Sequence, residues 1–144
     1  MKTDDLMVGY WVMNPFQVDT CESPYAKIDS IDGERVTFLL DGFVKITGSE
    51  KNINPVSLTP EMLAKNGFYV NPNYNEGWLV CDKYPDWEIS IKVTEQPFRM
   101  VIINQTNATD PHDGISLAKK IQFVHELQQA IKTCEIEKEI QLWS

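Results

Sequence analysis

The run His-Glu-Leu-Gln-Gln at residues 125–129 comes closer than any other part of the sequence to a catalytic motif. It differs by one letter from His-Glu-x-x-His, in which two histidines one helical turn apart bind zinc and the glutamate acts as general base. Gln129 stands at the second histidine position, and an amide is a poor zinc ligand. Because no third protein ligand is evident downstream, the run does not predict a protease-like zinc site.

The same run fits an amphipathic helix from about 116 to 133. At about 100° per residue, the apolar residues of this segment share one arc, which we expect to face the core: Leu117, Ile121, Val124, Leu127 and Ile131. His125 lies on the flank of the arc, so we predict a boundary histidine packed by its ring and bonded through one nitrogen. Gln128 lies inside the arc, and a buried unpaired amide costs about 1–3 kcal/mol. We therefore predict that Gln128 is a buried polar residue bonded to backbone groups of the neighbouring sheet or of an edge strand.

Three possible metal ligands, Asp110, His112 and Asp113, share one loop. The simpler interpretation of this loop is structural, because Asp-Pro and Asp-Gly are turn-forming pairs and Asp113 or Ser116 can cap a following helix. We expect no cofactor and no metal, and this loop stays open as the alternative metal site.

Aromatic residues gather near the ends of predicted strands and near turns. Tyrosine and tryptophan give large, rigid contacts at recognition surfaces, and they are also ordinary core and rim residues of small sheets. Those near turns are expected to be exposed and form the candidate binding surface: Tyr74, Trp78 and Tyr84.

Other catalytic and targeting motifs are missing from the sequence. It contains no P-loop, no Gly-x-Gly-x-x-Gly and no Gly-x-Ser-x-Gly, which would mark nucleotide or nucleophile sites. The three cysteines are far apart and odd in number, which favours reduced thiols in a cytoplasm, with Cys81 as a structural thiol. The start carries two early aspartates and no window approaches about 18 apolar residues, so we expect neither a signal peptide nor a membrane span.

The 144 residues are 42% hydrophobic and 24% charged, with a formal net charge of −8. This composition is typical of a soluble globular domain. Because an acidic surface repels phosphates and no Lys/Arg-rich run offsets it, nucleic-acid binding is disfavoured. The acidic residues are scattered, so a nucleic-acid mimic is disfavoured as well.

The first part of the chain favours short strands. Residues 6–13 are β-branched and aromatic, residues 25–40 form a hairpin pattern around Asp32-Gly33, and residues 42–47 suggest a further strand. Without any helix pattern, these strands predict an SH3-like small β-barrel over 5–56.

A short connector helix follows within 57–68. Its start and stop are both well defined in the sequence. Thr59 suits the N-cap and Pro60 the first helical position. Leu58 and Leu63 are placed for a hydrophobic staple, and Gly67 can end the helix.

Residues 68–105 return to strand patterns that predict an antiparallel meander, with 98–105 as a central strand. The helix of 116–133 would cover this meander, and a last strand at 137–143 would close the structure. The fold class is therefore predicted as α+β: one compact chain with sub-lobes 5–56 and 57–144.

Three stretches together resemble a known family: "VGYWV" at 8–12, "INPVSLTPEMLAKNGF" at 53–68 and "VHELQQAIK" at 124–132. The family consists of small uncharacterised bacterial and phage or mobile-element proteins with an I-P-L-T-x-E-x-L-x-x-x-G-F segment and a C-terminal V-H-x-L-Q-N helix. Gln129 departs from it where asparagine is usual, and "TCEIEKEI" replaces a turn containing Thr-Gly. The resemblance implies an architecture and a mobile-element setting, but no catalytic residue.

We expect a binding protein without catalysis, a cytoplasmic adaptor or inhibitor of phage or mobile-element origin. It would contact a protein partner through an aromatic surface or an exposed strand edge, and self-association into a homo-oligomer stays open. A small-ligand or nucleotide binder that sequesters a signalling molecule is the alternative, although the acidic charge opposes phosphate ligands unless Lys and Arg converge locally. A hydrolase with an unrecognised site is the third hypothesis.

Overall fold

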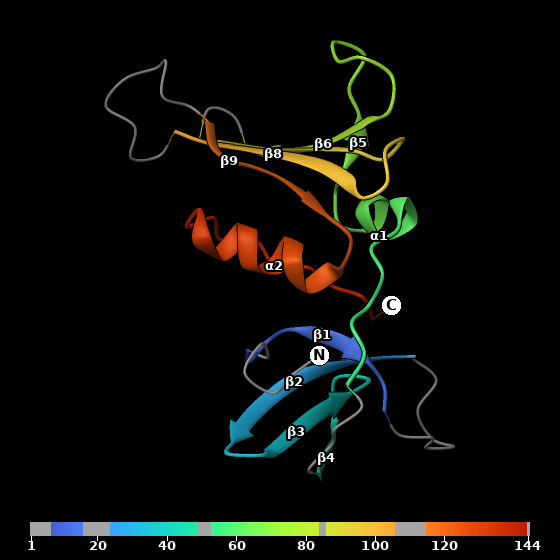
Figure 1. The fold of residues 1–144 in the computed structure, drawn as a ribbon, viewed down its shortest axis with the longest axis vertical. Helices are drawn as coiled ribbons and strands as arrows, with labels where there is room; N and C mark the ends of the chain where they lie inside the picture. The colour runs from blue at the N-terminus through green and yellow to red at the C-terminus, as the bar shows by residue number, and fades with distance from the viewer. Residues whose placement is uncertain (1–6, 16–23, 49–52, 84–85, 106–114, 144) are drawn as a thin grey trace. The chain divides into compact units, whose positions relative to one another are not determined.

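The computed structural model describes residues 7–15, 24–48, 53–83, 86–105 and 115–143. These residues are mostly β, with two short helices and two antiparallel sheets of four and five strands (Figure 1), which confirms the α+β class. The chain divides into two compact units. Unit 1 comprises Met1–Ser57, Phe123–His125 and Gln141–Ser144, and unit 2 comprises Leu58–Gln122 and Glu126–Ile140.

Unit 1 holds the four-stranded sheet, in the order β1-β2-β3-β4. Its strands are β1 (Trp11–Met13), β2 (Tyr25–Asp32), β3 (Arg35–Leu40) and β4 (Val44–Gly48). The predicted hairpin is confirmed: Asp32 pairs with Arg35 around a two-residue turn, and Gly33 supplies the positive φ of +61° that this turn needs.

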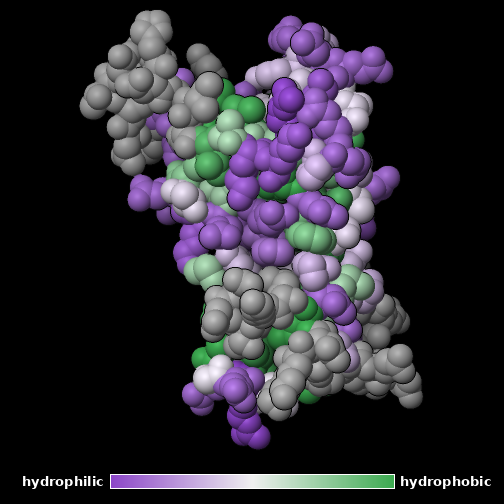
Figure 2. All heavy atoms as spheres, in the orientation of Figure 1, coloured by the Kyte–Doolittle hydropathy of each residue, from purple (hydrophilic) through white to green (hydrophobic). Residues whose placement is uncertain are grey.

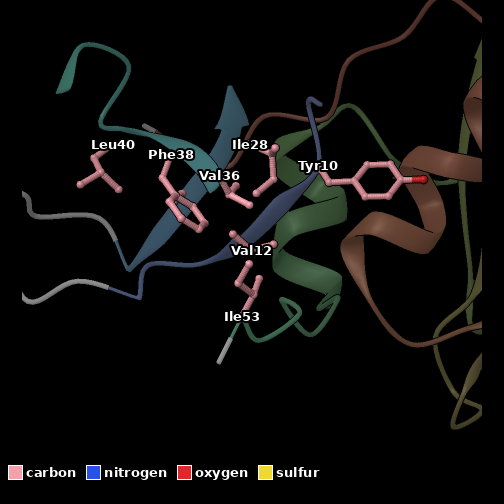
Figure 3. Close-up of a cluster of buried hydrophobic side chains, with 8 residues drawn as sticks. Tyr10, Val12, Ile28, Val36, Phe38, Leu40 and Ile53 are labelled. Atoms are coloured by element: carbon pink, nitrogen blue, oxygen red, sulfur yellow. The ribbon is translucent and has the colours of Figure 1, made fainter. Parts of the chain in front are cut away.

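Alternating side chains of β1–β3 form the core of unit 1 (Figure 3). Phe38 and Leu40 come from β3, Ile28 from β2 and Val12 from β1, and all four are at most 1% exposed. Period-2 alternation puts these residues on one face of the sheet. Tyr10 lies at one end of the cluster with its ring directed away from the other labelled side chains (Figure 3).

The predicted closure into an SH3-like barrel is not found, because the described strands keep an open order from β1 to β4. The free side of β1 is met by the segment after β4, where the Met13 N–H donates to the Asn54 carbonyl at 2.9 Å and Val12 lies opposite Pro55. Proline has no N–H to donate, so this contact remains an isolated bridge. β1 is also shorter than the predicted 6–13, because Gly9 has a φ of +93° and the chain turns before Trp11.

The C-terminal segment of unit 1 anchors Trp143 on the same sheet. The Trp143 ring packs edge-on against Trp11, with centroids 4.4 Å apart, and its Nε1–H donates to the Tyr25 carbonyl at 3.3 Å. Trp11 is fully buried. The strand predicted at 137–143 is wrong, because these residues form no strand and Trp143 is held by ring packing instead.

In unit 2, α1 (Pro60–Lys65) has the predicted caps. The Thr59 hydroxyl accepts from the Met62 N–H at 3.2 Å, and Pro60 occupies the first helical position. At the other end, the Phe68 N–H reaches the Leu63 carbonyl at 3.0 Å, and Gly67 takes a φ of +88°. This hydrogen-bond pattern is a Schellman motif, which ends the helix.

The five-stranded sheet of unit 2 has the order β5-β6-β7-β8-β9. Its strands are β5 (Tyr69–Val70), β6 (Trp78–Lys83), β7 (Trp87–Lys92), β8 (Phe98–Asn104) and β9 (Ile115–Ile121). The expectation of a central strand at 98–105 is confirmed, since β8 pairs with both β7 and β9. One face of the sheet carries buried side chains that include Ile89, Ile91, Met100 and Ile102, and α2 (Val124–Thr133) runs along one side of the sheet (Figure 1).

The helix predicted from 116 is wrong over its first part, because 115–121 form β9 and the helix begins at Val124. Leu117 and Ile121 are four apart, a spacing that places two residues on one face of a strand as well as of a helix. Alanine and lysine between them favour a helix, but β8 offers backbone groups that only a neighbouring strand can pair. Pairing with β8 therefore overrides the local helix propensity.

α2 ends in a second Schellman motif. The Ile136 N–H donates to the Ile131 carbonyl at 3.1 Å, the Glu135 N–H donates to the Lys132 carbonyl at 3.0 Å, and Glu135 has a φ of +56°. The Asn104 amide of β8 also donates to the Cys134 carbonyl, which satisfies an otherwise open acceptor at the helix end.

Hydrophobic residues show only in small areas among hydrophilic ones on the face of the molecule drawn in Figure 2. This agrees with the burial of most large apolar side chains in the described cores. Neither helix in the described part of the chain is long and apolar enough to cross a membrane.

Candidate functional site

The candidate site is the face of the five-stranded sheet that lies opposite its buried core side, called here the outer face. Directly paired residues of neighbouring strands share a face, so the strand register places the outer-face residues in three rows that cross the sheet. Successive rows lie two residues apart, about 7 Å along the strands.

The acid row has Asp82 of β6 directly opposite Glu88 of β7, with Ile103 of β8 next to Glu88. The middle row is small and largely apolar, with Val80, Ser90, Val101 and Ala118. Tyr69 of β5 lies beside Val80 at the end of this middle row.

The basic row lies at the other end of the outer face. Trp78 pairs with Lys92, Lys92 with Arg99, and Arg99 with Lys120. The outer face is therefore polarised along the strands, since the acid and basic rows are four residues apart, about 13 Å.

Tyrosine hydroxyls stabilise the acid row. Two like charges directly opposite on a sheet repel each other. Tyr69 donates its hydroxyl to Asp82 Oδ1 at 3.0 Å, and Tyr74 donates its hydroxyl to Glu88 Oε1. The Ser90 hydroxyl donates to Glu88 Oε2 at 3.3 Å. Each carboxylate thus receives hydrogen bonds, and among the described residues neither forms an ion pair with Lys or Arg.

The loop between β5 and β6 brings Tyr74 over β7. Two hydrogen bonds to Asn71 fix the start of the loop. The Asn73 N–H donates to the Asn71 side-chain oxygen at 2.9 Å, and the Tyr74 N–H donates to the Asn71 backbone carbonyl at 3.0 Å. Its end is fixed by Gly77, whose φ is +95° and where a Cβ would lie 2.6 Å from Thr94 Oγ1. The loop can therefore present Tyr74 in one defined position.

Both tyrosines stay protonated at neutral pH. Burial raises the pKa of Tyr74 to about 12, and the hydrogen bond to Glu88 and the charge of that carboxylate act in the same direction. The hydrogen bond to Asp82 is the largest of the effects that raise the pKa of Tyr69. Since a neutral phenol is a donor, both hydroxyls remain available to the carboxylates.

One carboxylate forms ion pairs with two residues of the basic row. Glu95, in the turn between β7 and β8, forms ion pairs with Lys92, whose Nζ lies 3.6 Å from Oε1, and with Arg99, whose Nε lies 3.3 Å from Oε2. Lys120 lies on the edge strand β9 and is exposed. The row thus holds three cations, of which Lys92 and Arg99 share one carboxylate, and it keeps a net positive charge.

Of the aromatic residues predicted as the binding surface, two belong to the outer face and one is outside the described residues. Tyr74 is exposed in its loop and Trp78 is half-buried beside Lys92, whereas Tyr84 lies outside the described residues. Tyr69, Asp82 and Glu88 are not among the residues predicted for the binding surface, because cross-strand register is what brings them together. The only signal for them is the alternation of residues along β6 and β7.

The predicted metal ligands Asp110, His112 and Asp113 lie outside the described residues. Within the described ranges, no group of three or more His, Cys, Asp or Glu side chains could hold a metal ion.

His125 and Gln128 are both half-buried. The His125 ring stacks on the Phe123 ring, with ring centroids 5.8 Å apart. Its centroid also lies 5.7 Å from that of the Tyr10 ring. The Nδ1 atom of His125 is shielded from solvent. Gln128 lies on α2 between Leu127, which is buried, and Gln129, which is exposed.

Cys81 is buried on the core side of β6, at 7% exposure. Burial raises the pKa of its thiol, and the nearby Lys138 ammonium opposes this shift in part. At neutral pH Cys81 is therefore protonated and a poor nucleophile, in keeping with a structural role.

The outer face combines aromatic rings, hydroxyl donors and charges of both signs on paired strands. Such an arrangement is suited to contact with another surface, because its side chains are already held in position. Comparison with protein-family models, curated proteins and solved structures finds no match to this chain.

Proposed function

We propose that this chain is a non-catalytic binding protein that acts through protein–protein contacts made by its outer face. The observation that carries the proposal is the polarised arrangement of acid and basic rows, with tyrosines fixed on the acid row. The sequence resemblance described above supports a setting in phages or mobile elements, where the protein would act as a cytoplasmic adaptor or inhibitor.

The tyrosines are well placed to make contacts. Tyr69 is 45% exposed and Tyr74 is 37% exposed, yet each hydroxyl is already hydrogen-bonded to a carboxylate. A ring that is fixed before binding loses little conformational entropy on binding, so more of its contact energy contributes to affinity. Large exposed rings with fixed positions are typical of recognition surfaces.

The charges define the partner's chemistry. A complementary protein surface carries basic groups where it meets Asp82 and Glu88, and acidic groups where it meets Arg99 and Lys120. The two sets of groups on that surface are separated by about 13 Å, the distance between the rows. Complementary charge patterns fix orientation and exclude wrong partners more than they add affinity.

The test compares capture of proteins from the native host by wild type and by charge-reversed variants. Asp82→Lys and Lys120→Glu change the outer face, and Asp32→Lys and Lys45→Glu make the same charge changes at exposed positions in unit 1. Proteins captured by wild type should be retained by the unit 1 variants and lost by the outer-face variants. Quantitative mass spectrometry measures the loss, and calorimetry with the purified partner confirms direct binding.

Two outcomes would contradict the proposal. In one, the captured proteins remain bound to both outer-face variants, so binding uses another surface. In the other, wild type captures no protein that binds it directly once purified.

A further inference from the structure

We infer that the acid row of the outer face binds an arginine side chain of a protein partner, with its guanidinium paired to both Asp82 and Glu88. The inference rests on the proposed function, because it names the group by which the partner meets one end of the outer face. It goes further, because it requires an arginine there and neither a lysine nor a calcium ion.

The negative charge of the acid row is not neutralised within the described part of the chain. Asp82 lies directly opposite Glu88, and like charges in such a pair destabilise each other. The groups that donate to these carboxylates in the structure are uncharged hydroxyls, those of Tyr69, Tyr74 and Ser90. A hydroxyl satisfies an acceptor oxygen but leaves its charge in place. The acid row therefore favours an added cation.

The acceptor positions that remain suit a planar donor. A carboxylate offers about four acceptor positions, whereas Asp82 accepts one hydroxyl and Glu88 accepts two among the described residues. Directly opposite residues have Cβ atoms about 5 Å apart, so one guanidinium can reach both carboxylates. Its N–H donors are fixed in one plane and can bond to both at once.

Exposed tyrosine rings lie beside the acid row. Tyr69, which pairs with Val80, is 45% exposed, and Tyr74 is 37% exposed. A guanidinium can stack on an aromatic ring while its edge pairs with a carboxylate. Both rings are held by hydroxyl bonds to Asp82 and Glu88, so they lose little conformational entropy when an arginine packs on them.

Contact at this end of the outer face is confined to the acid row and its neighbours. Val80 and Ser90 are 0% and 6% exposed, so a partner cannot reach the middle row at β6 and β7. Asp82 is exposed and Glu88 is half-buried. Ile103, which pairs with Glu88, is half-buried as well and offers apolar surface to the methylene groups of an arginine.

Other cations fit these groups less well. An ammonium is a compact, strongly hydrated charge without the planar fork, so a lysine gains less from two carboxylates and a ring. Calcium takes about six to eight oxygen ligands, and two carboxylates that already accept hydroxyl donors offer fewer. The Tyr74 phenol stays protonated beside them, because burial and the bond to Glu88 raise its pKa to about 12.

The test is an NMR titration of the isotope-labelled full-length chain with two blocked peptides, Ser-Gly-Arg-Gly-Ser and Ser-Gly-Lys-Gly-Ser. The backbone amide signals of Tyr69, Tyr74, Asp82 and Glu88 should shift. The arginine peptide should bind at least about threefold more tightly than the lysine peptide. A third peptide with citrulline, which has the shape of arginine without its charge, should leave these signals in place.

Charge-removing variants locate the binding. Asp82→Asn and Glu88→Gln nearly keep the side-chain shapes, so each should weaken binding of the arginine peptide at least about threefold. Asp32→Asn, at an exposed position in unit 1, is the matched control and should bind like wild type. Dispersed signals from the rest of β6 and β7 show that the five-stranded sheet is folded in each variant.

The inference is overturned if the acid row does not shift, if the arginine and lysine peptides bind equally, or if either folded acid-row variant binds like wild type. In each of these cases, a captured protein that is lost with Asp82→Lys and Lys120→Glu would still support the proposed function. If the arginine peptide binds as expected and no protein is captured, the proposed function fails while arginine binding at the acid row stands.

Discussion

Tyr74 shows how one residue's chemistry depends on its neighbours. Its loop places the hydroxyl on Glu88, and burial raises its pKa to about 12 from the usual 10. Because the folded pKa is above the unfolded one, the protonated phenol stabilises the fold below about pH 10. This contribution is lost as the pH rises through about 12.

The Tyr74 titration can be measured by phenolate absorbance, as the difference between wild type and Tyr74→Phe. Glu88→Gln should lower the pKa of Tyr74, because it removes the charge and weakens the hydrogen-bond acceptor. Burial remains, so the pKa should stay above the usual value. Glu61→Gln, on the exposed side of α1, is the control and should change nothing. An unchanged Tyr74 titration in Glu88→Gln would show that the two residues do not interact in solution.

Gly77 fixes the other end of the same loop. A Cβ there would lie 2.6 Å from Thr94 Oγ1 and 2.7 Å from Cγ2, and the φ of +95° is itself unfavourable for other residues. Gly77→Ala should therefore lower the free energy of unfolding by about 2–3 kcal/mol. Gly33→Ala is the matched control, since its φ is also positive but nothing lies within 4 Å, so it should cost only about 1 kcal/mol. Urea unfolding measures both, and equal losses would argue against the clash with Thr94.

At the scale of elements, the structure was predictable where local chemistry decides. α1 begins and ends where Thr59, Pro60 and Gly67 predict, because capping depends on residues within one helical turn. β9 was missed because Leu117 and Ile121 fit either a helix or a strand, and pairing with a distant strand decided between them. Most of the candidate site was missed for the same reason: Tyr74 and Trp78 stand out by type, whereas Asp82 and Glu88 gain meaning only from the register.

The end of α2 gives a prediction at this scale. Glu135 holds the left-handed position of the Schellman motif, with a φ of +56°, where glycine is preferred. Glu135→Gly should raise the free energy of unfolding by about 0.5–1 kcal/mol, because relief of backbone strain outweighs the added freedom of the unfolded chain. Glu137→Gly, which is exposed and outside the helix, should give no gain. Thermal or urea unfolding that shows no difference between the two variants would contradict this account of the helix end.

At the scale of the whole chain, unit 1 is built from three separate segments. The ring of Trp143 lies on Trp11, and its N–H reaches the Tyr25 carbonyl, 118 residues away in sequence. No local pattern predicts a contact over such a separation, which is why the C-terminal residues suggested a strand. The four-stranded sheet therefore depends on residues from both ends of the chain.

Trp143→Ala tests that dependence. It removes the edge-on ring contact and the hydrogen bond, and it exposes the buried ring of Trp11, so the free energy of unfolding should fall by about 2–3 kcal/mol. Hydrogen exchange should speed up in β1 and β2, the strands that Trp143 contacts. Trp143→Phe keeps a ring against Trp11 and loses only the N–H donor, so it should cost about 1 kcal/mol. If both variants exchange like wild type in β1 and β2, the C-terminal segment does not support the sheet of unit 1, and residues 1–57 with 123–125 must suffice for its stability.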